Sequence, residues 1–183
     1  VLHYARALLE LDMIDDYLLL MYAHLAHHQD AGTQVAYEQV DIKTEEGARR
    51  RRAGQVAPCQ FTVPTMLAWA LAYDDRDGET LWLMRGAPER WWDTPGTISG
   101  PLVFAGGFTM LDWSITVRDE GAWLAIDSEI ERINKIVLRT RGKKIANDDV
   151  GGDELDEIRI ADDRETLILA GDFDMTQVAL FWA

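Results

Sequence analysis

The stretch that decides the fold class, residues 62–84, reads TVPTMLAWALAYDDRDGETLWLM. Its first part is apolar nearly all round, which is typical of a buried helix. Thr62 is a suitable N-cap, and Pro64 is tolerated in a first helical turn, so we predict a helix from one of these residues to Tyr73. The charged turn over 74–78 ends this helix, and a short strand follows it. The hydrophobic period therefore changes here from that of a helix to that of a strand.

The sequence before this switch is helical. Residues 4–28 carry apolar side chains close to the helical period and contain no glycine or proline, so we predict one long helix. Three successive leucines at 18–20 indicate burial on more than one side. A long polar connection over residues 33–60 joins this helix to the next, and the two form a helical hairpin.

The sequence after the switch alternates between apolar and polar residues, as half-buried strands do. Short strands at this spacing, separated by turn-rich segments, predict an antiparallel β-sandwich. We therefore expect an α+β fold, with a helical hairpin in residues 1–92 and the sandwich in residues 93–183. The predicted strands after the boundary cover residues 108–117, 122–128, 135–140, 156–160, 166–169 and 178–182.

Composition excludes several classes of protein. The 183 residues include 18 Lys and Arg against 32 Asp and Glu, which gives a formal net charge of −14. A nucleic-acid partner is not expected, because neutralising phosphates needs a basic surface. A membrane is not expected either, since no apolar run reaches the roughly 18–20 residues that span a bilayer. The single cysteine, Cys59, excludes an intramolecular disulfide.

Two helices of this kind do not close a core. Their nearly continuous apolar surface needs further helices to cover it. The chain also begins with Val1 rather than Met. We therefore expect the end of a longer protein, completed by a preceding N-terminal segment or by a partner chain.

Three segments carry a resemblance to a known family. They are Gly32-Thr33 with Tyr37-Glu38-Gln39, residues 58–64 (PCQFTVP) and residues 79–91 (ETLWLMRGAPERW). In this order they resemble the C-terminal end of bacterial six-hairpin glycosidase-like proteins, whose helices form an (α/α)6 toroid. The resemblance implies the last hairpin of the toroid followed by a trailing sandwich.

The same resemblance implies a carbohydrate-active enzyme. A glycoside hydrolase is the first expectation, with a carbohydrate substrate, no cofactor, and most catalytic residues outside this chain. A non-catalytic scaffold or sugar-binding module is the alternative. A polysaccharide lyase is a further alternative, which needs a His or Tyr base near an acidic sugar.

The candidate catalytic residues are two carboxylates of the long connection. Glycoside hydrolysis uses a pair of carboxyl groups that flank the scissile bond. Inter-helix loops form the mouth of a toroid, so Glu38 and Asp41 are well placed to supply such groups, although a loop of an acidic chain also contains carboxylates by chance. Tyr37 and Gln39 flank Glu38 and are candidates to bind sugar hydroxyls.

Two more candidates for substrate binding lie near the predicted helix ends. Gln60 stands close to the start of the second helix, where free N–H groups meet ligands. His28 could line a lyase cleft together with Tyr37 and the basic run 49–52. His24 and His28 share a helix face at the spacing of some zinc sites, but the glutamate of the metalloprotease motif is missing, and we expect no metal.

Aromatic residues give a weaker signal. Flat indole rings match the apolar faces of sugars, so the tryptophans invite an interpretation as sugar-stacking residues. The alternation around Trp113 and Trp123 fits core positions equally well, and we expect most of the tryptophans to be buried.

Overall fold

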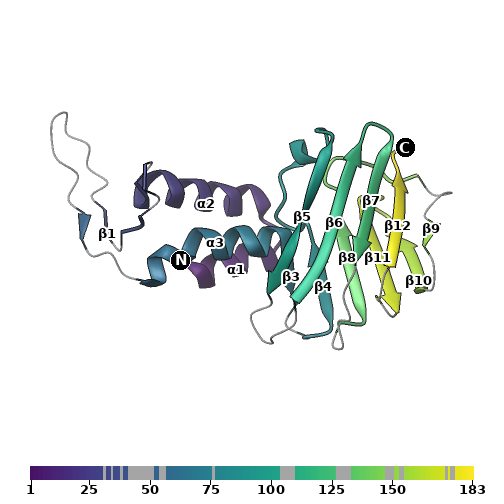
Figure 1. The fold of residues 1–183 in the computed structure, drawn as a ribbon, viewed down its shortest axis with the longest axis horizontal. Helices are drawn as coiled ribbons and strands as arrows, with labels where there is room; N and C mark the ends of the chain where they lie inside the picture. The colour runs from purple at the N-terminus through teal and green to yellow at the C-terminus, as the bar shows by residue number, and fades with distance from the viewer. Residues whose placement is uncertain are drawn as a thin grey trace. The chain divides into compact units, whose positions relative to one another are not determined.

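The computed structural model divides the chain into two compact units, Val1–Trp69 and Ala70–Ala183 (Figure 1). The predicted α+β class is confirmed, with α-helices in the first unit and two five-stranded sheets in the second. The structure describes residues 1–30, 32–33, 35–37, 39–40, 52–53, 57–75, 77–103, 110–126, 133–146, 151–152, 155–171, 173 and 176–183.

Two of the helices form a tight antiparallel hairpin at the start of the chain (Figure 1). Helix α1 spans Leu2–Glu10 and helix α2 spans Ile14–His28, so the prediction of one helix over 4–28 is wrong. The break lies at Asp12, whose φ of +57° is in the left-handed region. Aspartate adopts this conformation more readily than most side chains, and it reverses the chain here.

Helix α3 spans Ala57–Leu71 and begins earlier than predicted. Pro64 lies inside it, where the ring removes one intrahelical hydrogen bond. Thr62 is not the N-cap, because its hydroxyl donates to the carbonyl of Pro58, one turn back, at 3.2 Å. The residues after Leu71 form a strand, so the helix is shorter at its C-terminal end than the predicted limit of Tyr73.

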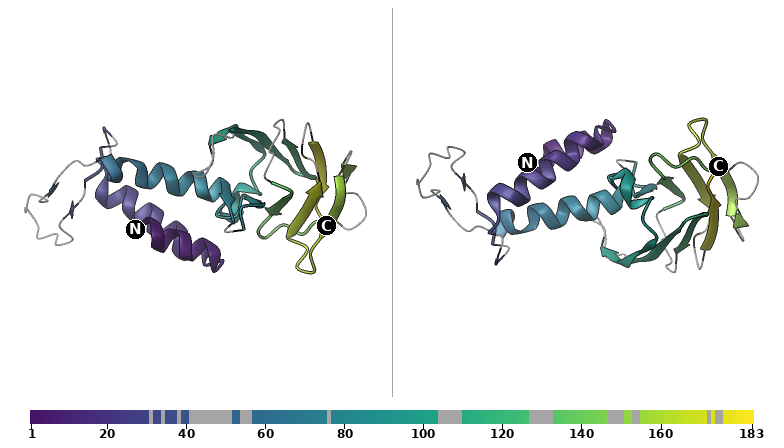
Figure 2. Two further views of the ribbon diagram at one scale, coloured as in Figure 1. Left: turned by 90° about the horizontal axis from the view of Figure 1, so that it is seen from below. Right: turned by 90° about the horizontal axis from the view of Figure 1, so that it is seen from above.

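The buried side chains of each helix in the first unit lie on one side of it. Figure 2 shows α2 and α3 approaching one another at the end where the connection joins them. The Tyr17 hydroxyl of α2 donates to the backbone carbonyl of Met66 in α3, and burial raises the pKa of Tyr17. The connection that joins α2 to α3 in the sequence contains two short strands, β1 (Gln39–Val40) and β2 (Arg52–Ala53), which pair antiparallel. The buried side chains on the first two helices are Ala5, Leu8 and Leu9 of α1 and Ile14, Tyr17, Met21 and His24 of α2.

The second unit contains two five-stranded sheets among the residues that the structure describes. The first sheet has the strand order β10-β11-β8-β4-β3, and the second has the order β5-β6-β7-β12-β9. All neighbours are antiparallel except β4 and β8, which run parallel with Thr80 opposite Lys135. The strands are β3 (Ala72–Asp74), β4 (Thr80–Leu83), β5 (Gly96–Val103), β6 (Met110–Arg118), β7 (Gly121–Ile126), β8 (Lys135–Arg139), β9 (Gly151–Gly152), β10 (Leu155–Ile160), β11 (Thr166–Gly171) and β12 (Thr176–Phe181).

A single hydrophobic core joins the inner faces of the two sheets. Trp92 and Trp113 belong to it with exposed fractions of 1% and 3%, and the alternating pattern predicts this for Trp113. The other tryptophans are half-buried, so the expectation that most of them are buried is wrong. Strands β3 and β4 pair within the first sheet, and for this reason residues 70–92 belong to the second unit. The two units therefore divide between Trp69 and Ala70, ahead of the boundary expected between residues 92 and 93.

Candidate functional site

The chain reverses immediately after α2 and forms a short ladder. Gln29 and Ala36 lie opposite one another in an antiparallel β-bridge. The hydrogen bonds of this bridge are made by the backbone groups of the residues next to them. The Asp30 N–H donates to the Val35 carbonyl at 3.0 Å, and the Tyr37 N–H donates to the His28 carbonyl at 2.8 Å. This ladder is the base of the connection between α2 and α3.

Gln60 of α3 ties this base to the helix. Its Oε1 accepts from the Ala36 N–H at 3.1 Å, and its Nε2 donates to the Ala36 carbonyl at 2.8 Å. Ala36 is fully buried, and its own N–H and C=O point away from the ladder. The Gln60 amide therefore pairs both backbone groups as a neighbouring strand would.

His28 and Tyr37 are joined by side-chain contacts as well as by the ladder. His28 Nδ1 lies 3.2 Å from the Tyr37 carbonyl oxygen. A carbonyl only accepts, so Nδ1 carries the hydrogen, and Nε2 of the neutral ring carries a lone pair. The Tyr37 hydroxyl donates to Asp30 Oδ2 at 2.9 Å. The structure thus gathers three predicted substrate-binding residues, His28, Tyr37 and Gln60, around one stretch of backbone.

His24 supports this cluster from one turn earlier in α2. Its ring stacks on that of His28, with centroids 4.2 Å apart and planes inclined by 12°. Burial lowers the pKa of His24 to about 4, helped by repulsion from His28 and from the amino group of Val1. His24 is therefore neutral at pH 7.

The stacked pair is a poor chelate. Ligand lone pairs lie in the ring plane, so two nearly parallel rings do not direct them at one ion. Within the described part of the chain, no group of three or more His, Cys, Asp and Glu residues could hold a metal ion.

The predicted catalytic carboxylates, Glu38 and Asp41, lie outside the described residues, and their role stays a prediction. The backbone of Gln39 forms part of β1, but its side chain is outside the description too.

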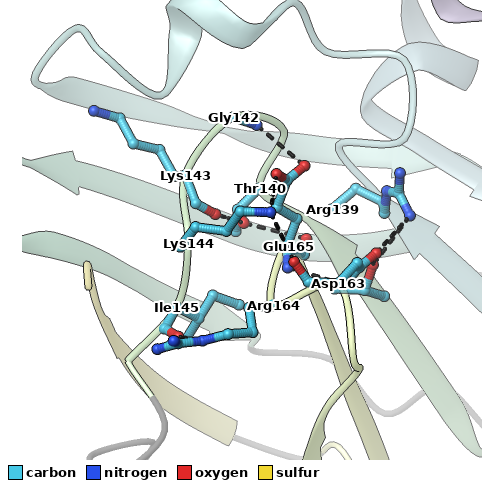
Figure 3. A network of polar contacts seen from close by, with 10 residues as sticks. Arg139, Thr140, Gly142, Lys143, Lys144, Ile145, Asp163, Arg164 and Glu165 are labelled. Atoms are coloured by element: carbon cyan, nitrogen blue, oxygen red, sulfur yellow. Dashed lines mark hydrogen bonds and ion pairs between the residues drawn. The ribbon is translucent and has the colours of Figure 1, made fainter.

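A second polar cluster lies at one end of β8 and β11 (Figure 3). It includes the basic segment 139–144, which reads RTRGKK. The buried hydroxyl of Thr140 shares its one hydrogen between two backbone carbonyls, those of Lys143 at 2.7 Å and Glu165 at 3.1 Å. The ion pairs are Arg139 with Asp163 at 3.2 Å, Lys144 with Glu165 at 2.7 Å and Lys143 with Asp93 at 2.6 Å.

The pKa values of Asp163 and Glu165, the two acids labelled in Figure 3, are both lowered. Burial raises the pKa of Asp163, but hydrogen bonds from Thr166 and from the Glu165 N–H, with the charge of Arg139, outweigh it and lower the pKa. The bond from Lys144 is the main reason why the pKa of Glu165 is also lowered. A carboxylate of this kind does not suit a proton donor at neutral pH.

The turn in this cluster occurs twice in the first sheet. The sequences Asp77-Gly78-Glu79-Thr80 and Asp163-Arg164-Glu165-Thr166 precede β4 and β11. Each aspartate accepts from the N–H two residues on at 2.9 Å and from the threonine hydroxyl at 2.7–2.8 Å. The second residue has a positive φ in both turns, +73° at Gly78 and +58° at Arg164. The shared Asp-x-Glu-Thr pattern is a sequence signal that hydrophobic periodicity misses.

Trp123 is one of the tryptophans outside the buried core. Trp123 lies on the outer face of the second sheet, half-buried, with the Arg118 guanidinium 4.4 Å over its ring. Thr116 is its cross-strand neighbour, and the Thr116 hydroxyl lies 3.0 Å from that of Thr97. This face therefore combines an aromatic ring with a row of hydroxyl groups.

Comparison with known proteins gives no match to a family model, to a curated protein or to a solved structure. Among the described residues, no helix combines the length and the apolar character that a membrane crossing requires.

Proposed function

We propose that this chain is the C-terminal part of a carbohydrate-active enzyme, a glycoside hydrolase that uses carboxylate general acid/base chemistry. The observation that carries the proposal is the cluster of His28, Tyr37 and Gln60 at the base of the connection. Glu38 follows Tyr37 directly in the sequence, and Asp41 lies three residues further on. In this proposal the connection forms one wall of the substrate cleft.

The chemistry of the cluster suits a sugar. His28 Nε2 can accept a hydrogen bond from a hydroxyl, because Nδ1 is held as a donor by the Tyr37 carbonyl. Gln60 acts through Ala36 and fixes the backbone from which the connection leaves. Most catalytic residues lie outside this chain in this proposal, on the other hairpins of the toroid.

The exposed apolar side chains of the helices support the proposal that a further segment or chain packs on them. Large exposed hydrophobic residues, as far as the structure describes the chain, all lie in the first unit. A contiguous apolar surface on helices favours further packing. We propose that a preceding segment or a partner chain completes the toroid. The residues are Val1, Tyr4, Leu11, Met13, Leu19, Tyr22, Leu25, Phe61 and Leu67.

A glycan panel tests the proposal. Glycan binding is measured for the parent chain, for Glu38→Gln and for Glu157→Gln, because most catalytic residues lie outside this chain in this proposal. The last is a matched control, because Glu157 is an exposed carboxylate on β10. We expect Glu38→Gln to weaken binding by about tenfold, the effect of losing a hydrogen bond to a charged group, with the control unchanged. Equal affinity of the Glu38 variant and the parent removes Glu38 from the substrate site, and no binding to any glycan contradicts the proposal.

A non-catalytic sugar-binding module is the second candidate, favoured by Trp123 and the nearby hydroxyls of Thr97 and Thr116. It predicts that Trp123→Ala abolishes glycan binding while His28→Ala leaves it intact. The hydrolase predicts the reverse order of effects.

A polysaccharide lyase is the third candidate, favoured by the position of the His28 ring beside the backbone of Tyr37, which makes His28 the candidate base. Such an enzyme removes the proton next to the carboxylate of an acidic sugar. The bond between the adjacent ring carbon and the glycosidic oxygen breaks, the leaving sugar takes a proton, and a C=C bond forms in the product. An increase in ultraviolet absorbance on acidic glycans alone, lost in His28→Ala, would select this candidate over the hydrolase.

A further inference from the structure

Helix α2 is apolar on two opposite sides. Its inner side is buried within the first unit. Its outer side carries a stripe of residues at four- and three-residue intervals, which therefore share one face. Leu19 and Tyr22, in the middle of this stripe, are 66% and 44% exposed. A helix with two apolar sides needs cover on both. The stripe consists of Asp15, Leu19, Tyr22 and Ala26, all of them exposed.

The stripe is complementary to itself when the helix is turned end for end. Rotation about a point between residues 20 and 21 exchanges Leu19 with Tyr22 and Asp15 with Ala26. Two copies of α2 packed antiparallel therefore place each Leu19 against the Tyr22 of the other copy. Residues of one stripe then meet only residues of the same stripe, as an isologous two-fold interface requires.

The charges along α2 fit the same arrangement. Asp16 and His27 lie on the same flank of the stripe, near opposite ends of the helix, and both are exposed. In an antiparallel pair, Asp16 of each copy lies beside His27 of the other. The macrodipoles of two antiparallel helices also oppose one another favourably.

We propose that a second copy of this chain covers the outer side of α2, with the two α2 helices antiparallel across a two-fold axis. The Leu19–Tyr22 contacts form its centre, and the Asp16–His27 pairs form its rim. The arrangement goes beyond the proposed function and uses none of the candidate site residues. It assigns Leu19 and Tyr22 to a second copy, and it leaves the other exposed apolar residues of the first unit to the segment or chain that completes the toroid.

Light scattering after size-exclusion chromatography tests the association. One helix-on-helix contact is small, so the full chain is loaded at concentrations up to about 200 µM. We expect the parent to shift from monomer to dimer, and Leu19→Glu or Tyr22→Glu to raise the dissociation constant at least about tenfold. Leu11→Glu is the matched control, because Leu11 is 70% exposed but lies in the turn before α2. Circular dichroism establishes that each variant keeps its helices.

A charge exchange tests the antiparallel register. Asp16→Lys and His27→Glu are each expected to weaken the dimer about two- to fivefold, and the double variant to recover most of the loss. Within one helix these positions are 11 residues, or about 16 Å, apart, so the rescue can arise only between copies.

Three results would overturn the proposal. The parent could stay monomeric at every concentration, which is also the result if another segment of the chain covers the stripe. The dissociation constant of the dimer could stay unchanged in Leu19→Glu and rise in Leu11→Glu, which places the interface elsewhere. The double charge variant could fail to recover, which excludes the register. Glycan binding is unaffected by each of these results, so failure here is distinct from failure of the proposed function.

Discussion

The bond pair between Gln60 and Ala36 allows a quantitative test of how the candidate site is built. The change is Gln60→Leu, which keeps the size of the side chain and removes both polar groups. The Ala36 N–H and carbonyl, which now bond at 3.1 and 2.8 Å, lose their partners in a fully buried position. A neutral hydrogen bond contributes about 1 kcal/mol net, and unpaired buried groups cost more. We expect the free energy of unfolding of the first unit to fall by about 2–3 kcal/mol.

Urea denaturation followed by circular dichroism at 222 nm measures this effect, because the α-helices that the structure describes lie in the first unit, apart from the last two residues of α3. Gln177→Leu is the matched control, since Gln177 is exposed on β12 and the substitution is the same. The control should stay within about 0.5 kcal/mol of the parent. A Gln60→Leu variant as stable as the control would refute the role of Gln60 in holding the connection.

Three further predictions concern the two units separately. The pKa of His24 in the folded chain, about 4, lies below the ordinary value of about 6.5, so the unfolded state binds the proton first. Its contribution to stability is complete above about pH 6.5 and is lost as the pH falls toward 4. The helical signal in urea should show this slope, and a His24→Phe variant with the same slope would contradict it. Gly121→Ala should destabilise the second sheet by several kcal/mol, because the new Cβ would lie 2.0 Å from the backbone oxygen of Leu180. Gly96→Ala, with nothing within 4 Å, should be nearly neutral, and equal urea midpoints by tryptophan fluorescence would disprove the difference. Arg164→Ala should cost more than Arg164→Gly, because both lose the bonds to a loop carbonyl but only glycine suits a φ of +58°; the reverse order of thermal midpoints would contradict this.

The helical part shows what periodicity can and cannot predict. The helical nature of residues 4–28 follows from the spacing of apolar side chains, but the reversal at Asp12 does not. The apolar period continues through the turn, because α1 and α2 both bury side chains in the first unit. Pro64 indicated a helix start, whereas α3 accommodates it in its interior and begins at Ala57.

The sheets were predictable where residues alternate and not where glycine and proline interrupt them. Strand β5 reads GTISGPLV and gives no alternating signal, yet it pairs with β6 along its whole length. The parallel pair of β4 and β8 joins residues more than fifty positions apart, and no local pattern records it.

The candidate site was predicted in part. His28, Tyr37 and Gln60 were selected by residue type and position, and the structure brings them together. The backbone role of Gln60 could not be foreseen, because its partner, Ala36, is 24 positions away and lacks a functional side chain. The roles of Glu38 and Asp41 stay predictions.

The most direct test of the central claim is a glycan titration of the isotopically labelled chain, followed residue by residue by NMR. The hydrolase account predicts that the amide and side-chain signals of His28, Tyr37, Gln39 and Gln60 shift on binding, and that Glu38→Gln changes this response. Shifts confined to the face around Trp123, or no shift with any glycan of the panel, would contradict it.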